Sequence, residues 1–310
     1  MSATPIHERQ LTTAAYLREL GLPELPPRTH PFDPGYDPQT VISHLGQSAH
    51  LMASLKISMA CWLVGGEEAY RAKIAFARKC GVTTVAGGGP FEIAVALGKL
   101  DPYLALCADM GIARIEAGQG FTDMPLAPAE VARRARAFGL GLQFELGKKH
   151  TGAFGEGTVD ALIEQGQAWL DAGAVYLVVE ARESGAGVGV FDPNGALNRE
   201  AADRLAAAFG LDRLVFEAPN KPSQFALLRH FGDGVALANV RLEEVLRVEI
   251  FRRGLHSDAF DVDVFKRRLE SARAPEGRAA PDSEIAAMAS APLYQERLER
   301  EGPGQFTTAR

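Results

Sequence analysis

The chain has 310 residues, of which 46% are hydrophobic and 23% are charged, and its formal net charge is -6. This composition is typical of a folded globular protein, and the mildly acidic balance argues against nucleic acid or a membrane surface as the main partner. No apolar run approaches the ~20 residues of a membrane span, and the N-terminus lacks the apolar core of a signal peptide. Three cysteines without a CxxC spacing predict reduced thiols, no zinc site and a cytoplasmic protein.

The predicted elements begin with an N-terminal extension over residues 1–27, which holds an amphipathic helix at 7–20 and a proline-rich link. From residue 28 to 262, short apolar runs alternate with amphipathic helical stretches. The predicted strands are residues 29–33, 53–59, 82–86, 112–116, 140–145, 174–179, 213–217 and 235–239. The predicted helices open at Asp37-Pro38 and then cover residues 66–80, 91–98, 101–110, 128–138, 159–170, 201–209, 223–230 and 242–252.

This alternation predicts an α/β fold, a single (β/α)8 TIM-type barrel that forms one domain. A doubly wound sheet would carry GxGxxG after its first strand, and this chain does not. Residues 263–310, rich in Ala, Glu and Arg, are predicted to form a C-terminal tail with one helix outside the barrel. The terminal extensions could make a subunit contact, so a homo-oligomer stays open.

Acidic side chains end several of the predicted strands. Four of these strands end on a glutamate, at Glu116, Glu145, Glu180 and Glu217, and Asp33 and Asn239 stand at the ends of the first and last strands. In a barrel these groups meet on the face that carries catalysis. Crowded carboxylates repel unless a cation neutralises them or some stay protonated. Because only oxygen ligands are available, the pattern favours Mg²⁺, or Mn²⁺ in its place.

Basic residues lie near the same strand ends, at Lys56, Lys148, Lys149, Arg182 and Lys221. Oxygen ligands mixed with cations suit a small anionic, phosphorylated substrate that also binds the metal. The glycines at 185, 187 and 189 after Glu180 allow positive φ and would let the backbone close around a ligand, or they form only a flexible turn. Taken singly, each feature could be loop chemistry, and Arg182 with Glu183 could be a salt bridge. Four glutamates at equivalent strand ends are harder to dismiss.

Six stretches of the chain carry distinctive motifs. They are GGGPFE (87–92), ELGKK (145–149), DAGAVYLVVEARESGAGVGVFD (171–192), LVFEAPNK (214–221), LANV (237–240) and RVEIFRRGLHSDAF (247–260). Through these stretches, over roughly residues 28–260, the chain resembles the phosphosulfolactate synthase family of coenzyme M biosynthesis. The resemblance implies a carbon–sulfur lyase that adds sulfite to C3 of phosphoenolpyruvate with Mg²⁺, giving 2-phospho-3-sulfolactate. A plant heat-stress-associated protein belongs to the same superfamily, so a non-catalytic binding role stays open.

The resemblance also implies roles for individual residues. A lysine whose pKa is lowered by burial or neighbouring cations would protonate C2, and either Lys148 or Lys149 could be that acid. The catalytic candidates are Lys148, Lys149, Glu180 and Arg182, and the metal ligands, direct or through water, are Glu116, Glu145, Glu180 and Glu217. The candidates for binding substrate are Asp33, Lys56, Gly88, Gly89, Arg182, Glu183, Lys221 and Asn239.

Three departures from the family pattern fall in the first half of the barrel. Residues 32–35 read Phe-Asp-Pro-Gly where the family has Leu-Asp-Lys-Gly. Residues 57–60 read Ile-Ser-Met-Ala for Phe-Gly-Trp-Gly, and residues 118–120 read Gly-Gln-Gly for Ser-Asp-Gly. Loss of the lysine would weaken binding of a dianion such as sulfite. An enzyme that keeps phosphoenolpyruvate or a related carboxylate but uses another nucleophile, or that catalyses an elimination, is therefore the alternative.

Overall fold

The computed structural model describes residues 12–22, 24–150 and 152–259. By its internal contacts the chain divides into two units, Met1–Lys266 and Arg267–Arg310, and all described residues belong to the first. The predicted C-terminal tail and the start of the predicted N-terminal helix lie outside the described residues. Within the described part, no helix has both the length and the apolar composition needed to cross a membrane.

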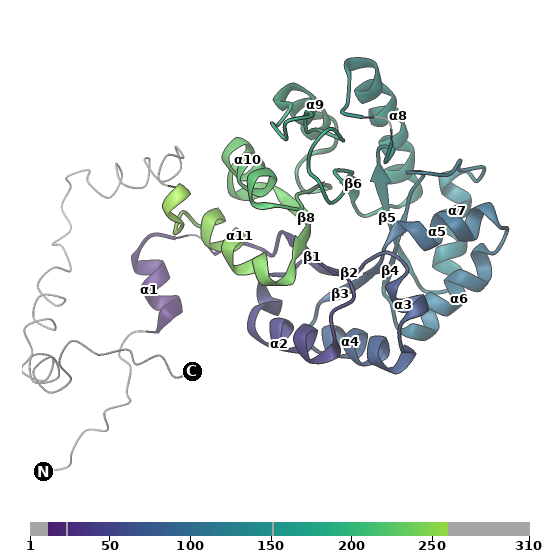
Figure 1. The fold of residues 1–310 in the computed structure, drawn as a ribbon, viewed down its shortest axis with the longest axis horizontal. Helices are drawn as coiled ribbons and strands as arrows, with labels where there is room; N and C mark the ends of the chain where they lie inside the picture. The colour runs from purple at the N-terminus through teal and green to yellow at the C-terminus, as the bar shows by residue number, and fades with distance from the viewer. Residues whose placement is uncertain (1–11, 23, 151, 260–310) are drawn as a thin grey trace, which may run out of the picture. The chain divides into compact units, whose positions relative to one another are not determined.

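In the described part of the chain, eight parallel strands form a closed barrel in sequence order (Figure 1). The strands are β1 (Thr29–Asp33), β2 (Ser54–Ile57), β3 (Thr83–Ala86), β4 (Arg114–Ala117), β5 (Gly141–Leu146), β6 (Leu177–Val179), β7 (Leu214–Glu217) and β8 (Ala236–Arg241). Pairing of β1 with β8 closes the ring. The predicted (β/α)8 barrel is therefore confirmed, and every predicted strand is present.

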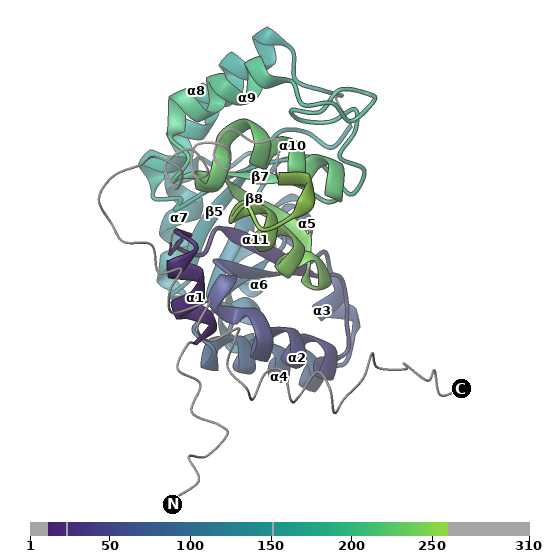
Figure 2. The same ribbon diagram turned by 90° about the vertical axis from the view of Figure 1, so that its left-hand side faces the viewer.

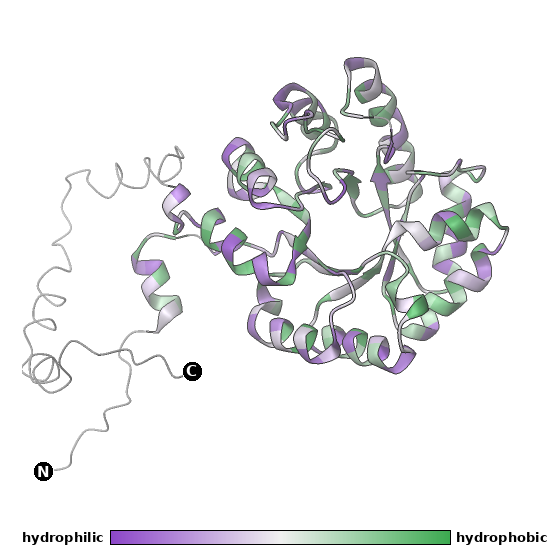
Figure 3. Cartoon of the chain, in the orientation of Figure 1, coloured by the Kyte–Doolittle hydropathy of each residue, from purple (hydrophilic) through white to green (hydrophobic). Residues whose placement is uncertain are grey.

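Helices surround the strands (Figure 1), and most show both hydrophobic and hydrophilic residues (Figure 3). They are α2 (Pro38–Ser48), α3 (Cys61–Val64), α4 (Glu67–Lys79), α5 (Gly88–Ala96), α6 (Leu100–Met110), α7 (Pro128–Ala137), α8 (Glu156–Ala172), α9 (Arg199–Phe209), α10 (Lys221–Phe231) and α11 (Val245–Arg252). Asp37 caps α2 as predicted, since its side chain accepts a hydrogen bond from the Thr40 N–H. The short α3 was not predicted. Helix α5 starts at Gly88, three residues before the predicted start at Phe91. The predicted start was late because glycines and a proline weaken the helical pattern of the sequence there.

Neighbouring residues of a strand point to opposite faces of the barrel wall. Phe144 and Phe216 point outward, where they stack on Trp169 of α8 and Phe231 of α10 with ring centroids 4.2 Å and 5.4 Å apart. Both phenylalanines are fully buried, and truncation of such a side chain to alanine costs about 3–5 kcal/mol. Packing of these outward side chains fixes the register that turns the glutamates next to them toward the barrel axis.

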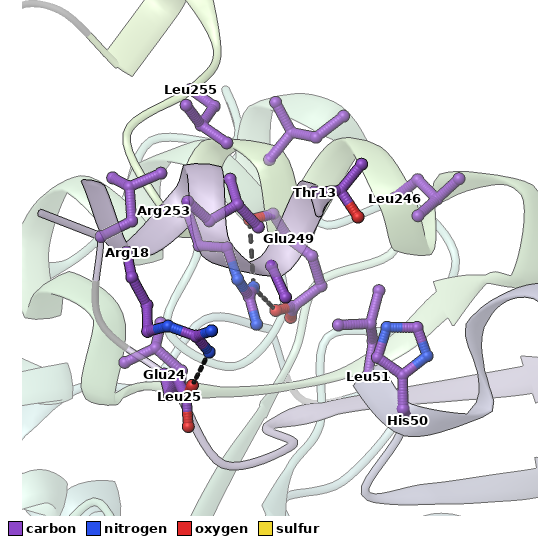
Figure 4. A pocket seen from close by; sticks show the side chains of 14 residues that line it. Thr13, Arg18, Glu24, Leu25, His50, Leu51, Leu246, Glu249, Arg253 and Leu255 are labelled. Atoms are coloured by element: carbon purple, nitrogen blue, oxygen red, sulfur yellow. Dashed lines mark hydrogen bonds and ion pairs between the residues drawn. The ribbon is translucent and has the colours of Figure 1, made fainter. Parts of the chain in front are cut away.

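The N-terminal helix α1 (Thr13–Glu19) lies outside the barrel, near α11 in Figure 1 and on the side away from α3 in Figure 2. Residues of α1, of α11 and of the 3-10 turn Ala49–Leu51 line a cavity of about 460 Å³ (Figure 4). Leucine side chains form much of its wall. The charged groups in it are already paired, Arg18 with Glu24 at 3.2 Å and Arg253 with Glu249. None of the four strand-end glutamates lines this cavity.

Below the strand ends, the barrel interior holds both apolar and polar side chains. Val178, Val215, Ala236 and Ala238 form a small apolar cluster. Beside it, Nδ1 of His30 lies 2.8 Å from the Ser54 hydroxyl. Burial, together with the charge of nearby Arg114, lowers the pKa of His30 to about 3. The imidazole of the folded protein is therefore neutral at physiological pH.

We expect His30 to destabilise the fold in acid. An unfolded imidazole takes up its proton near pH 6.5, whereas folded His30 does so only near pH 3. Between these values the unfolded state binds more protons than the folded state. As the pH decreases through this range, the free energy of unfolding therefore decreases by up to about 1.4 kcal/mol per pH unit. In urea unfolding at several pH values, His30→Asn should flatten this decline, whereas the exposed control His50→Asn should not. Equal slopes in all three proteins would contradict the prediction.

Candidate active site

A cavity of about 710 Å³ opens at the carboxyl ends of the barrel strands. Its lining contains most of the predicted site residues: Lys56, Gly88, Gly89, Glu116, Glu145, Lys149, Glu180, Arg182, Glu183, Glu217 and Asn239. The four glutamates are almost fully buried, with 1–4% of each residue exposed. Side chains from β2 and from four other strand ends therefore meet in one place, as the strand alternation predicts.

Two lysines bridge the four carboxylates in pairs. Lys56 Nζ lies 3.3 Å from Oε1 of Glu116 and 3.1 Å from Oε1 of Glu217. Lys149 Nζ lies 3.0 Å from Oε1 of Glu145 and also contacts Oε2 of Glu180. Four carboxylates face two ammonium groups, so the buried cluster would carry two excess negative charges if every carboxylate were ionised.

Further donors orient three of the carboxylates. Glu116 accepts hydrogen bonds from the Gly88 N–H at 3.2 Å and from Nε2 of Gln143 at 2.8 Å, which occupy its two oxygens. Glu217 accepts from the Ala181 N–H at 3.0 Å, and Glu180 accepts from the Arg182 N–H at 2.6 Å. These bonds tie the carboxylates to neighbouring strands and loops, so their positions are set by the barrel itself.

Burial and the neighbouring charges shift the pKa values of three of the carboxylates. Burial raises the pKa of Glu217 to about 7, against the opposing charge of Lys56. Burial, with repulsion from Glu180, raises the pKa of Glu145 well above its usual range. Burial would also raise the pKa of Glu180, but Lys149 outweighs it and lowers that pKa to about 2. Of these three carboxylates, Glu180 therefore stays ionised down to the lowest pH.

The pKa of Lys149 departs from expectation. Burial acts to lower it, but the charges of Glu145 and Glu180 outweigh burial and raise the pKa above its ordinary value. Lys56 behaves in the same way between Glu116 and Glu217. The prediction of a lysine with a lowered pKa is therefore wrong. The sequence shows that carboxylates are near, but not that each ammonium lies between two of them.

Backbone strain is concentrated around this cavity. Among the described residues, the non-glycine residues with positive φ are Met59, Arg182 and Asn239, at 50°, 55° and 53°, and all three line the cavity. Each such conformation costs of order 1–3 kcal/mol and persists only where surrounding structure holds it. At Arg182 this backbone conformation lets the N–H group donate its hydrogen bond to Glu180. The Arg182 guanidinium donates to the Lys149 carbonyl at 3.2 Å.

The three glycines after Glu180 adopt the positive φ that glycine allows, at 58°, 67° and 62° for Gly185, Gly187 and Gly189. Gly189 also packs directly against β6, since a Cβ there would lie 1.9 Å from the Glu180 carbonyl oxygen. At Gly187 the nearest atom to a Cβ would be 3.8 Å away. The loop can therefore fold back over Glu180 only if residue 189 has no side chain.

This difference predicts the effect of two matched substitutions. Gly187→Ala places a side chain at positive φ and should cost about 1–2 kcal/mol. Gly189→Ala has the same strain plus a clash with backbone, so we expect it to lower the thermal midpoint clearly further and to disturb Glu180. Thermal unfolding of both variants beside the parent protein measures this. Equal losses at the two positions would show that the close approach to Glu180 is not a constraint.

The structure separates three predicted residues from the site. Asp33 is fully buried but turned away, pairing with Lys73 Nζ at 2.6 Å and accepting from the N–H groups of Gly35 and Tyr36 at 2.9 Å and 2.7 Å. Lys221 is the first residue of α10 and pairs with Asp258 at 2.9 Å. Lys148 is exposed and lines a different cavity of about 300 Å³ beside α8. The prediction that these three residues belong to the site is therefore wrong, because the local backbone points each side chain elsewhere.

Sequence reasoning also missed residues that shape the site. Lys73 of α4 is buried and partners Asp33, and Gln143 is the inward residue of β5 that orients Glu116. Glu92 of α5, inside the GGGPFE motif, is fully buried and binds the loop after β4. A charged residue on an otherwise apolar helix was the available signal for Glu92. Among the described residues, no three His, Cys, Asp or Glu side chains are arranged to hold one metal ion.

Residues 25–258 match the family model of (2R)-phospho-3-sulfolactate synthase (ComA). The phosphosulfolactate synthase of Methanocaldococcus jannaschii is 34% identical over 229 residues, which cover 74% of this chain and 91% of that protein. The phosphosulfolactate synthase of Methanothermobacter thermautotrophicus is 26% identical over 227 residues, covering 73% and 88%. That of Bacillus subtilis is 29% identical over 191 residues, covering 61% and 75%. With these similarities and a barrel whose mouth gathers the four glutamates, the chain belongs to the phosphosulfolactate synthase family.

Proposed function

We propose that this chain adds sulfite to C3 of phosphoenolpyruvate in the presence of Mg²⁺ and protonates C2, giving 2-phospho-3-sulfolactate. The observation that carries this proposal is the buried carboxylate cluster with Lys149 held between Glu145 and Glu180. Membership of the phosphosulfolactate synthase family supports the substrate pair. The reaction makes a carbon–sulfur bond, so the enzyme would be a carbon–sulfur lyase acting in the direction of synthesis.

The carboxylate cluster fits Mg²⁺ in charge and donor type. It offers oxygen ligands and two more carboxylates than ammonium groups, although no three side chains are arranged around one point in the described part. Mg²⁺ is usually held by one or two carboxylates together with substrate oxygens and water. We assign it to Glu180, the carboxylate that Lys149 keeps ionised, aided by Glu145 or Glu217. Bound to the substrate carboxylate, Mg²⁺ would draw electrons away from C3.

Lys149 is the proposed proton donor. Its raised pKa keeps the ammonium charged at neutral pH, and its side chain is 28% exposed, so solvent can restore the proton after each turnover. Sulfite forms a bond to C3 of phosphoenolpyruvate, the double-bond electrons move toward the carboxylate, and Lys149 Nζ then gives a proton to C2. Glu145 and Glu180 fix the ammonium at one position, which is the requirement for a positioned acid.

The substrate anion would be held by groups on opposite sides of the cavity. The Gly89 backbone lies in the first turn of α5, where N–H groups favour anions, while the neighbouring Gly88 N–H already donates to Glu116. A Cβ at Gly89 would meet no atom within 4 Å, so the space beside it is open to a ligand. The guanidinium of Arg182, with Lys56 deeper in the cavity, supplies positive charge for the phosphate or carboxylate.

A second candidate keeps phosphoenolpyruvate but uses a different nucleophile. Phe32, Met59, Ile93 and Phe121 contribute apolar side chains to the cavity lining. Among the described lining residues the cations are Lys56, Lys149 and Arg182, and the first two are already paired with glutamates. Among these three lining residues, only Arg182 is a cation that is not paired with a glutamate, so a dianion such as sulfite would meet little positive charge. A less charged nucleophile would meet a smaller desolvation penalty there.

Phosphorus NMR of the purified protein with phosphoenolpyruvate, sulfite and Mg²⁺ separates these candidates. The proposal expects loss of the phosphoenolpyruvate signal and growth of a new phosphate-ester signal only when all three components are present. Consumption with another nucleophile, such as a thiol, but not with sulfite would favour the second candidate. An unchanged spectrum in every mixture would contradict both and favour a binding protein.

A further inference from the structure

We infer that Glu92 is a positioning residue, which sets the location of Lys149 through the loop formed by residues 118–122. Glu92 does not line the cavity and lies on α5, whereas Lys149 follows β5. The loop between β4 and α7 contacts both residues. The inference deepens the proposed function and rests on it for its kinetic part, but its structural part can be measured without any turnover.

Glu92 holds the loop through one carboxyl oxygen. Its Oε2 accepts hydrogen bonds from the N–H groups of Phe121 and Thr122 at 3.0 Å and 2.9 Å, and from the Thr122 hydroxyl at 3.1 Å. The side chain is fully buried. Three donors on one buried oxygen fix two successive residues of the loop, because breaking them would leave the carboxyl group and two N–H groups unpaired.

The same loop contacts Lys149 through Gly120. The Gly120 carbonyl accepts a hydrogen bond from the Lys149 N–H at 2.9 Å. A Cβ at Gly120 would lie 3.1 Å from both Cγ and Cε of Lys149 and 3.4 Å from Oε1 of Glu145. The loop backbone at Gly120 therefore packs closely against the aliphatic part of the Lys149 side chain. This part of the side chain carries the ammonium that contacts Glu145 and Glu180.

The other oxygen of Glu92 argues against a purely stabilising role. Oε1 is buried and has no hydrogen-bond partner among the described residues. A Cβ at Gly118 would lie 3.4 Å from this oxygen and 3.6 Å from Cβ of Glu145, so Gly118 keeps Glu92 and Glu145 close together. An unpaired buried oxygen costs about 1–3 kcal/mol, which an apolar side chain would avoid. The carboxyl group of Glu92 instead holds the loop in one position next to Glu145 and Lys149.

Substitutions at residues 92 and 120 test the inference, with Gly46→Ala as a control because a Cβ at Gly46 meets no atom within 4 Å. Glu92→Ala frees the loop and should lower kcat by about tenfold or more, while KM for phosphoenolpyruvate changes by less than about threefold. Glu92→Gln keeps an oxygen that can accept the same three bonds, so it should restore most of kcat. Gly120→Ala pushes on Lys149 directly and should lower kcat with Glu92 intact.

A second readout does not depend on turnover. Acetic anhydride at a limiting dose, followed by peptide mass spectrometry, compares the labelling of Lys149 with that of the exposed Lys148 in each folded variant. Glu92→Ala and Gly120→Ala should each change this ratio by at least about threefold, whereas Glu92→Gln and Gly46→Ala should not. An unchanged ratio in both variants would overturn the inference, even if kcat fell. A changed ratio in a protein without sulfite-adding activity would uphold the positioning and contradict the proposed function.

Discussion

Lys149→Ala is expected to lower kcat for the proposed sulfite addition by about 10²-fold or more, the usual scale for loss of a positioned proton donor. The neighbouring Lys148→Ala should leave kcat within about threefold of the parent value, since a group outside the cavity cannot reach C2. Lys149 Nζ lies among the buried carboxylates, whereas Lys148 is exposed and lines the cavity beside α8. Initial rates of phosphoenolpyruvate consumption with saturating sulfite and Mg²⁺ measure both variants.

This pair is a strict test because the two substitutions are chemically the same and adjacent in the chain. Any general effect of removing a lysine from the loop after β5 would appear in both variants. Similar rates in the two variants, or a larger loss at Lys148, would remove Lys149 as the donor. Thermal unfolding of both proteins checks that neither rate reflects a smaller folded fraction.

Glu180→Gln is expected to raise the Mg²⁺ concentration needed for half-maximal activity by about tenfold or more, and to lower kcat as well. Glu180 is the carboxylate that Lys149 keeps ionised, with a pKa lowered to about 2, so it supplies the most dependable negative charge in the cluster. The amide has nearly the same shape but no charge. It would weaken metal binding and leave Lys149 paired with Glu145 alone.

The Mg²⁺ activation curve gives the comparison, and Glu130→Gln is a suitable control. Glu130 lies on α7, where its ion pairs are with Arg133 and Arg134 on the outside of the barrel. Its Mg²⁺ curve should match that of the parent protein. If Glu180→Gln also leaves the curve unchanged, Glu180 is not part of a metal site.

Much of the fold follows from patterns visible in the sequence. Short, mostly apolar runs that alternate with helical stretches predicted every strand, and β1 was predicted with the bounds that it has, Thr29–Asp33. The four glutamates could be grouped without coordinates, because equivalent ends of parallel strands meet at one rim of a barrel. Positive φ at Gly185, Gly187 and Gly189 could likewise be expected from their alternate spacing.

The direction of individual side chains could not be predicted in the same way. Lys148 and Lys149 are adjacent, and the turn after Leu146 decides which of them enters the cavity. Asp33 stands at a strand end like the glutamates, but its own loop and Lys73 capture it. Lys73 and Glu92 lie on helices and not at the ends of strands, so only the three-dimensional packing reveals their contacts. The raised lysine pKa values depend on distances of about 3 Å, which no sequence pattern specifies.

The most direct test is a crystal structure of the protein soaked with phosphoenolpyruvate and Mn²⁺. Mn²⁺ replaces Mg²⁺ in this experiment because its anomalous scattering locates the metal. We expect one anomalous peak within coordination distance of the Glu180 carboxylate, with the phosphorylated acid between that ion, Lys149 and Arg182. A metal and ligand bound elsewhere, such as in the cavity beneath α1 in Figure 4, or an empty mouth at saturating ligand, would contradict it.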